Sequence, residues 1–286
     1  MEYIVSLAVL VGIYVILSSS FNLVIGFGGL ISIAHPIFFA LGAYTTGLLA
    51  IHYNTNPVLA VVAGGVVAFL SSVMLSLPSL RISGDYLLIT SIGFQLGLLE
   101  VIKHLGFTGG ASGLGNIPNV VAGSSRSTVF AVVSCLMAVV VVLMIRWLLT
   151  GPYGRVISAM RDDELAFSAL GRNAMMIKLA IFAIGSGFAG LAGGIYAYYY
   201  QYISPDQFEI LQSGMLLTMV VVGGMGSHLG PVVGAVLLLL LPQAISFLNL
   251  PPSVMAPLQG VIFTTLVIVF IFWRPQGLIA PAKRQS

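Results

Sequence analysis

The residue types that perform chemistry in enzymes are few in this chain and are scattered along it. The four histidines are far apart: His35, His52, His104 and His228. No group of Cys, His, Asp and Glu has the spacing of metal ligands. A Walker A loop needs Gly-Lys-Ser/Thr, whereas Lys103, Lys178 and Lys283 follow Ile, Ile and Ala. The sequence therefore predicts no catalytic residue, no metal site and no cofactor, and any ATP would have to be hydrolysed by another chain.

A glycine-rich stretch resembles a nucleotide-binding loop only superficially. It reads Gly109-Gly110-Ala111-Ser112-Gly113-Leu114-Gly115 and follows an apolar stretch. A dinucleotide-binding loop requires a surrounding βαβ pattern, which this stretch lacks. We predict instead a flexible external loop over about 105–126 that meets a partner or moves during gating.

The polar segment 154–172 has the features of a short docking helix. Three consecutive acids, Asp162, Asp163 and Glu164, suit the positive end of a helix dipole, and Gly171 is a natural stop. Four apolar residues between them would share one shallow face: Leu165, Ala166, Ala169 and Leu170. The alternative is an interfacial helix that rests on lipid, but three acids do not suit an anionic membrane surface.

The composition excludes a soluble domain. Among 286 residues, 58% are hydrophobic and only 7% are charged, whereas soluble domains carry about 25% charged residues. No charged residue occurs between Glu2 and Arg81 or between Glu209 and Arg274. Each run is several times longer than the roughly 20 residues of one membrane-spanning helix. The chain is therefore expected to cross a membrane many times.

The apolar runs indicate helices. A transmembrane β-barrel would alternate apolar and polar positions, whereas stretches such as 58–77 are apolar on all sides. The predicted fold class is all-α: one polytopic transmembrane domain over 1–286, with Gly-interrupted helices in both halves and a short cytoplasmic helix. Glu2 and the lack of a basic n-region indicate a retained first span. The single cysteine, Cys135, excludes an intramolecular disulfide.

Apolar runs bounded by Pro, Gly and charge predict nine spans. They lie near 4–25, 36–52, 57–77, 86–104, 127–149, 178–199, 211–225, 230–248 and 256–273. Five basic residues lie in or beside 150–177, and three follow the last span, so the positive-inside rule places both regions in the cytoplasm. The N-terminus is then outside and the C-terminus is cytoplasmic. Arg126 is an exception on the external side.

The spans offer little to bind a coupling ion. Ion-coupled carriers usually keep an acid inside the bilayer, and the nearest case is Glu100, close to the outer end of 86–104. Lys103 and His104 share its helical face. We interpret these three residues as an interfacial cluster that anchors the helix end, so the driving energy should come from elsewhere.

Two segments suggest an internal repeat. Residues 28–36 lead to Gly-Ala at 42–43, and residues 223–231 lead to Gly-Ala at 234–235; each segment has a glycine pair, a Ser, a His and a Pro. In transporters, such interruptions at matching places in two halves point to a central site. The alternative is that small residues only allow close helix packing.

Several motifs follow one another in the order of a known transporter family. They are Asn22-Leu23 with Gly26 to Gly29 and Ser32 to His35, Leu80 to Tyr86, Thr108-Gly109-Gly110 with Gly113-Leu114, the 154–172 segment, Gly190 to Gly193, Gly223 to Ser227 and Arg274 to Leu278. The chain resembles the permease subunits of ABC importers for branched-chain amino acids, specifically the M-type subunit of the pair. The resemblance covers nearly the whole chain.

The resemblance implies that Arg161 to Gly171 form a coupling helix that inserts into a cleft on the ATPase subunit. The common form of this loop reads Glu-Ala-Ala, three residues, then Gly; counted back from Gly171, only Ala166 and Gly171 match. The expected coupling residues are Arg161, Asp162, Asp163, Glu164, Ala166 and Gly171. Among them, Asp163 and Glu164 are the candidate ATPase contacts.

The resemblance also implies an amino-acid substrate, whose charged groups need backbone groups or hydroxyls in transit and whose side chain needs an apolar wall. Broken-helix backbone in the two halves could supply the polar part. The expected pathway residues are Asn22, Phe27, Gly28, Ser32, His35, Gly223, Gly224, Gly226 and Ser227. For each of them, packing is the alternative role.

The expected function is translocation of branched-chain or hydrophobic amino acids across the cytoplasmic (inner) membrane of a bacterium or archaeon. The implied partners are ABC ATPase subunits, a second permease subunit in a heterodimer, an external substrate-binding protein and the lipid bilayer, with no nucleic acid. An ABC permease for urea, short amides or small aromatic acids stays open as an alternative. A passive channel for a small neutral solute also stays open, although it gives the acidic cytoplasmic helix no purpose.

Overall fold

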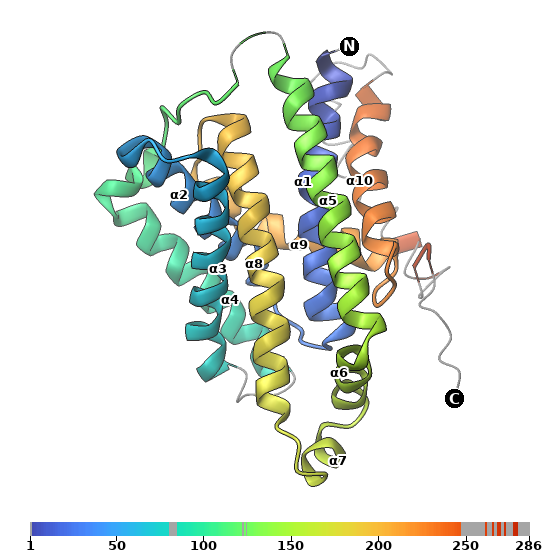
Figure 1. The fold of residues 1–286 in the computed structure, drawn as a ribbon. Helices are drawn as coiled ribbons and strands as arrows, with labels where there is room; N and C mark the ends of the chain where they lie inside the picture. The colour runs from blue at the N-terminus through green and yellow to red at the C-terminus, as the bar shows by residue number, and fades with distance from the viewer. Residues whose placement is uncertain are drawn as a thin grey trace.

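The computed structural model describes residues 2–79, 85–121, 123, 125–246, 261, 265, 268–269, 272 and 277–279. Within them the fold is all-α, as predicted (Figure 1). The helices are α1 (Glu2–Asn22), continued by the π-helical turn η1 (Leu23–Phe27), α2 (His35–Tyr53), α3 (Pro57–Ser79), α4 (Asp85–His104), α5 (Arg126–Thr150), α6 (Pro152–Asp162), α7 (Glu164–Ala169), α8 (Ala174–Tyr200), α9 (Ile210–Gly223) and α10 (Gly230–Ser246). Short 3-10 turns are η2 (Gly106–Thr108), η3 (Gly110–Ser112) and η4 (Pro205–Phe208).

Six helices of the described residues are long and apolar enough to cross a membrane. They are Glu2–Phe27, His35–Tyr53, Pro57–Met74, Tyr86–His104, Arg126–Thr150 and Ala174–Tyr200. These stretches coincide with the first six predicted spans. The helices α6 and α7 lie together at the end of the bundle opposite the N-terminus (Figure 1).

The seventh and eighth predicted spans correspond to α9 and α10, within the described residues. Helix α9 has 14 residues, about 21 Å of helix, and the hydrocarbon core of a bilayer is about 30 Å thick. The apolar part of α10 is Gly230–Gln243. The ninth predicted span lies almost wholly outside the described residues, as do the basic residues Arg81, Arg274, Lys283 and Arg284.

Irregular, glycine-containing backbone separates helices at one place in each half. Between η1 and α2 the chain is irregular over 28–34, with Gly29 at φ +67. Between α9 and α10 it turns over 224–229, where Gly224 has φ +122 and Gly226 has φ +77. Such φ values are readily adopted by glycine alone, which explains why both turns are rich in it.

Glycines bring α8 against α2 and α3, the two helices on which it packs most extensively. A Cβ at Gly42 of α2 would overlap the backbone of Gly190, and a Cβ at Gly193 would overlap the carbonyl of Phe39. Small residues at such crossings let helix backbones approach closely. Packing therefore explains Gly42, the glycine of the Gly-Ala pair in the first half.

The connection before α5 makes backbone contacts with the chain that follows α8. Leu114 and Ile203 form an antiparallel bridge, with N–H to O distances of 2.7 and 2.9 Å. The Tyr202 hydroxyl donates to the Ser112 carbonyl at 2.7 Å. A Cβ at Gly113 would overlap the Ile203 carbonyl, so the glycine permits this close pairing. Movement of the predicted loop over 105–126 during gating stays a prediction.

Arg126, the predicted exception to the positive-inside rule, is held by the end of α8. Its guanidinium donates to the carbonyls of Tyr198 and Tyr199, at 3.3 and 2.6 Å, and lies 6.0 Å from the Phe130 ring centre. The last carbonyls of a helix have no partners within the helix and carry its negative dipole end. A cation at this place is therefore satisfied locally.

The glycine packing predicts a stability difference between two alanine substitutions. Gly42→Ala should lower the free energy of unfolding by about 1–3 kcal/mol, because its methyl group would meet the Gly190 backbone. Gly97→Ala is the matched control, since no described atom lies within 4 Å of its Cβ position. Denaturation in detergent micelles would measure both. Equal stability of the two variants would contradict this packing.

Candidate functional site

The glycine turns of the two halves meet at the side chain of Asn22. Its Nδ2 donates to the carbonyl of Ser227 at 2.9 Å, and its Oδ1 accepts from the N–H of Gly226, also at 2.9 Å. Asn22 is buried, with 2% of its surface exposed. One amide group thus joins the end of α1 to a turn more than 200 residues further along the chain.

Two glycines allow this contact. A Cβ at Gly26 would overlap the Asn22 amide and come within 2.6 Å of the Gly226 nitrogen. Gly226 itself has φ +77, a conformation that costs other residues roughly 1 kcal/mol or more. The two turns can therefore touch only while both positions lack a side chain.

The 224–229 turn is closed by Ser227 and by a segment near the C-terminus. The Ser227 hydroxyl donates to the Gly224 carbonyl at 2.8 Å and accepts from the Gly230 N–H at 2.9 Å. The N–H groups of Leu278 and Ile279 donate to the carbonyls of Val222 and Gly223, at 2.9 and 3.0 Å. These bonds satisfy carbonyls at the end of α9, which an α-helix leaves unpaired.

Gly223 and Gly224, both predicted pathway residues, stand at this junction. A Cβ at Gly223 would overlap the Gly230 carbonyl, and one at Gly224 would overlap the Ile279 carbonyl. Their absent side chains therefore allow backbone contacts on both sides of the turn.

A small cavity lies beside the junction. It has a volume of about 10 Å³ and is lined by Ser19, Asn22, Phe27, Val142, Ile145, Ser227 and His228. The rings of Phe27 and His228 stack with their centres 5.3 Å apart. Ser19 Oγ and His228 Nδ1 are buried and have no hydrogen-bond partner in the described part of the chain. The space holds about one water molecule and is too small for an amino acid.

The other predicted pathway residues of the first half contact segments other than the 224–229 turn. Gly28 lies against Ile181 of α8. Ser32 Oγ accepts from the Ala34 N–H at 3.4 Å, and His35 Nε2 lies 2.8 Å from Ser20 Oγ. The structure thus brings together Asn22, Phe27, Gly223, Gly224, Gly226 and Ser227, while Ser32 and His35 pack within their own half.

The expected coupling helix is two helices. Helix α6 contains Arg161 and ends at Asp162, and Asp163 is extended, with φ −152 and ψ 98. The Asp163 carboxylate accepts from the Ala166 N–H at 2.9 Å and so caps α7. The helix therefore begins later than the Arg161 start implied by the resemblance, whereas its acidic start and its stop at Gly171 agree with the sequence prediction.

Helix α7 is held from one side and exposed on the other. Glu164 pairs with Lys178 of α8 at 2.6 Å, and Phe167 is 4% exposed. Leu165 and Leu170 are 84% and 80% exposed, and Ala166 and Ala169 are exposed with them. The predicted apolar face thus points away from the bundle.

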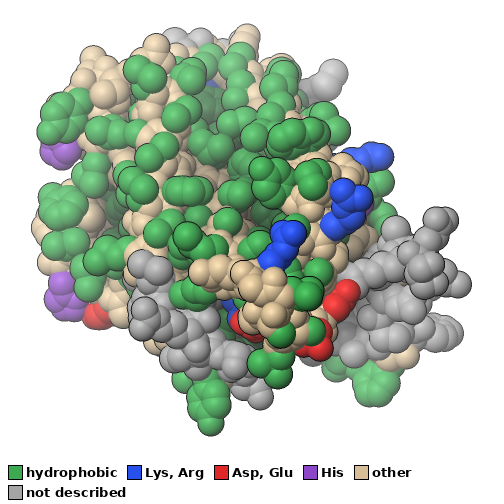
Figure 2. Space-filling model, turned by 60° about the horizontal axis from the view of Figure 1, so that its bottom comes forward, with side chains coloured by type: hydrophobic (Ala, Val, Ile, Leu, Met, Phe, Trp, Pro, Cys, Tyr) green, Lys and Arg blue, Asp and Glu red, His purple; other side chains and the backbone are tan. Residues whose placement is uncertain are grey.

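The two ends of the coupling segment, Gly171 and Arg161, have different surroundings. Gly171 has φ +75, which suits glycine at a helix stop, and a hollow of about 590 Å³ lies beside it, lined by Glu164, Ser168, Gly171, Arg172, Asn173, Ala174 and Met175. Arg161, at the other end, donates through Nη1 to the Gly26 carbonyl. Charged side chains gather at this end of an otherwise largely apolar surface (Figure 2).

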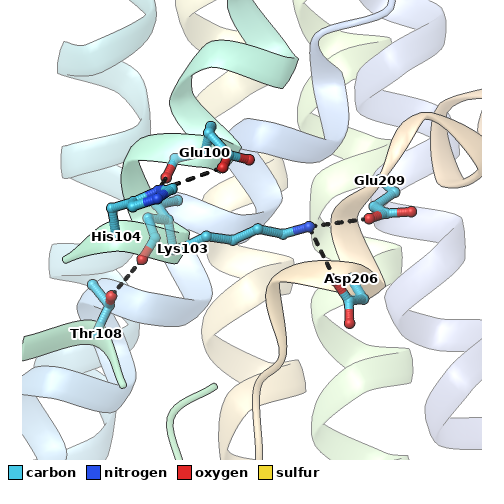
Figure 3. Close-up of polar contacts among 7 residues, drawn as sticks. Glu100, Lys103, His104, Thr108, Asp206 and Glu209 are labelled. Carbon is cyan, nitrogen blue, oxygen red and sulfur yellow. Dashed lines mark hydrogen bonds and ion pairs between the residues drawn. The ribbon is translucent and has the colours of Figure 1, made fainter. Parts of the chain in front are cut away.

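Lys103 at the opposite end of the molecule forms an ion cluster that differs from the predicted one. Its Nζ lies 3.2 Å from both Asp206 Oδ1 and Glu209 Oε1 (Figure 3). Glu100 pairs instead with His104, at 3.4 Å. The cluster therefore joins the end of α4 to η4 and the start of α9, beyond the anchoring role expected from helix spacing.

Sequence reasoning missed several polar contacts at membrane depth. Gln95 of α4 donates to the Phe208 carbonyl at 3.1 Å and accepts from the Ser213 hydroxyl at 2.9 Å. Ser19 and the stacking role of His228 were also missed. The sequence signal for such a contact is a polar residue inside an apolar run. Its partner cannot be predicted in the same way, because it comes from a distant segment.

These features define a class: a multi-pass helical membrane protein whose irregular glycine turns meet and whose charged end exposes the apolar side of a short helix. That class is a transport subunit.

Comparisons with known proteins agree with this class. The family model "Branched-chain amino acid transport system / permease component" matches residues 3–271. The chain is similar to the high-affinity branched-chain amino acid transport system permease protein LivM of Escherichia coli K12, 31% identical over 98% of this chain and 71% of the relative. The Salmonella typhimurium protein of the same name is 32% identical with the same coverage. A probable branched-chain amino acid transport permease protein LivM of Methanocaldococcus jannaschii is 26% identical over 94% of this chain and 90% of the relative. No solved structure gives a significant match.

The chain belongs to the family of branched-chain amino acid transport permeases. It is the permease component of such an ABC system and not an enzyme, and ATP is hydrolysed on separate subunits. A permease of this kind implies ATPase and binding-protein partners.

The Asn22 junction predicts an effect on stability. Asn22→Ala should lower the free energy of unfolding by about 2 kcal/mol, because it leaves a buried N–H and a buried carbonyl without partners. Asn119→Ala, in the exposed outer connection, should stay within about 0.5 kcal/mol. Denaturation of both purified variants checks this, and an Asn22 variant as stable as the control would exclude the junction.

Proposed function

We propose that the chain carries branched-chain amino acids across the inner membrane by alternating access, paired with a second permease subunit. The observation that carries this proposal is the meeting of two interrupted helices at Asn22, Gly226 and Ser227. Irregular backbone at membrane depth is tolerated only where it is buried in protein or lines a cavity. Family membership supplies the substrate class.

The pathway in this proposal opens where the small cavity now lies. Parting of the two turns would free the Asn22 amide, the Gly226 N–H and the Ser227 carbonyl to bind the charged ends of an amino acid. Ser19 and His228 already present polar atoms there. Phe27 would supply part of the apolar wall for the substrate side chain.

The ATPase contact in this proposal is the exposed face of α7. Leu165 and Leu170 offer apolar surface, and the adjacent hollow offers polar groups. Asp163 and Glu164 support the helix from within, since one caps it and the other pairs with Lys178. We therefore assign the acids to holding α7 and the leucines to the contact.

The membrane topology in this proposal has the N-terminus outside and the C-terminus in the cytoplasm. The α6–α7 end, with Arg155, Arg161 and Arg172, faces the cytoplasm by the positive-inside rule. Nine membrane segments keep this orientation, and the short helices α9 and α10 can form a pair that enters and leaves on the outer side without changing it.

Acidic substitutions on α7 test the contact. Leu165→Asp or Leu170→Asp should lower the affinity of the ATPase subunits at least about tenfold, because a charge would be buried in the contact, while the permease stays folded because both positions are exposed. Copurification and transport in proteoliposomes measure this. Arg155→Ala, on the exposed side of α6, is the control. Normal ATPase binding by both acidic variants would reject the assignment.

A charge swap separates the two possible roles of Glu164. Glu164→Lys should abolish coupled transport, because it places two cations where an ion pair stood. Adding Lys178→Glu should restore most of the transport if Glu164 only holds α7. A double variant as inactive as the single one, with both folded, would instead make Glu164 an ATPase contact.

Solute flux through the reconstituted chain alone would reveal a passive channel.

A further inference from the structure

Arg161 of α6 lies against both glycine turns. Its Nη1 donates to the Gly26 carbonyl in η1. Its Cγ lies 3.1 Å from the position a Cβ would take on Gly29, and its Nη1 lies 3.6 Å from the corresponding position on Gly226. The side chain thus lies over the turn of the first half and reaches the turn of the second.

The Gly26 carbonyl is a suitable acceptor for a cation. It belongs to the last turn of the α1–η1 helix, where carbonyls lack partners within the helix and the dipole is negative. The π-helical form of η1 adds a second reason, because single π turns are local irregularities often found at functional sites. The bond therefore forms where the helix is least regular.

The Gly26 carbonyl lies next to the Asn22 junction. Gly26 and Gly226 are in close contact, and Gly226 donates to Asn22, which in turn donates to Ser227. A movement of the Arg161 guanidinium would act first on Gly26 and then on this set of bonds. The path consists of three hydrogen bonds and one backbone contact.

Helix α6 is built to carry a displacement from α7. Ile157 and Met160 are 5% and 2% exposed, so its inner face is packed. Only Asp163 separates α6 from α7, and Asp163 caps α7. A displacement of α7 therefore also displaces Arg161, which lies two residues before the Asp163 cap, because no flexible linker separates the two helices.

We propose that Arg161 is a positioning residue that ties the coupling segment to the two glycine turns, and that it does not contact the ATPase. Displacement of α6 and α7 by the ATPase then moves the Gly26 carbonyl and opens or closes the junction of Asn22 with Gly226 and Ser227. The inference rests on the proposed function, and it adds the element that connects the docking face to the pathway.

The test compares Arg161→Met, Arg161→Gln and Arg161→Lys in the complete reconstituted complex. Amino acid transported per ATP hydrolysed should fall about tenfold in the Met variant, which cannot donate to Gly26. The Lys and Gln variants keep a donor and should recover part of this ratio. The ATPase subunits should still copurify with all three. Arg155→Met, on the exposed side of the same helix, should leave the ratio unchanged.

Each other outcome overturns the inference. An unchanged transport ratio in the Met variant would make Arg161 dispensable. Loss of ATPase copurification would place Arg161 at the ATPase contact. If the Met variant does not fold, the Gln and Lys variants decide alone: partial coupling by either one supports a donor role, and full uncoupling of both folded variants would contradict it. Failure of the proposed function is distinguishable, because it would appear as normal ATPase binding by the Leu165 and Leu170 variants.

Discussion

Backbone polar groups inside a bilayer must find partners within the protein, because no water is present to bind them. The ends of α1–η1 and α9 bring such groups together inside this permease, and the groups satisfy one another through Asn22. A side chain at position 26 would overlap the Asn22 amide, and one at position 226 would strain the backbone. The glycines at 26 and 226 thus lie on the two sides of one junction.

The junction also explains which parts of the protein are expected to stay rigid and which are expected to move during transport. Helices α2, α3 and α8 are locked by backbone contacts at glycine, whereas the junction depends on a few hydrogen bonds around a cavity of about 10 Å³. Breaking two or three hydrogen bonds costs far less than separating packed helices. Movement during transport is therefore expected at the turns, with the α2–α3–α8 core as the fixed frame.

The sequence predicted the helical class and the first six spans well, because uninterrupted apolar runs and charged ends mark them directly. It also placed a break between 225 and 230, where the chain turns between α9 and α10. The three acids and Gly171 marked the start and the stop of α7 correctly. The break between α6 and α7 at Asp163 was not predicted, because hydropathy does not report local backbone geometry.

The sequence predicted several residues of the site but not the residues that they contact. Asn22 and the 223–227 motif were found because their residue types are unusual in an apolar run. Their pairing was not predicted, since it joins positions more than 200 residues apart. The reach of Arg161 to Gly26 and the bridge from Leu114 to Ile203 were missed for the same reason. Composition made the bridged outer loop look flexible, because glycine serves both mobility and close contact.

The central claim is that the two glycine turns must separate for an amino acid to pass. Phe27 and His228 face each other across the junction with ring centres 5.3 Å apart, and Cys135 is the only cysteine. A Phe27→Cys/His228→Cys pair in a Cys135→Ser background, joined by a short bifunctional thiol reagent, would lock the turns together. The account predicts that transport stops on cross-linking and that each single-cysteine control treated with the same reagent keeps transporting. Undiminished transport by the cross-linked complex would contradict it.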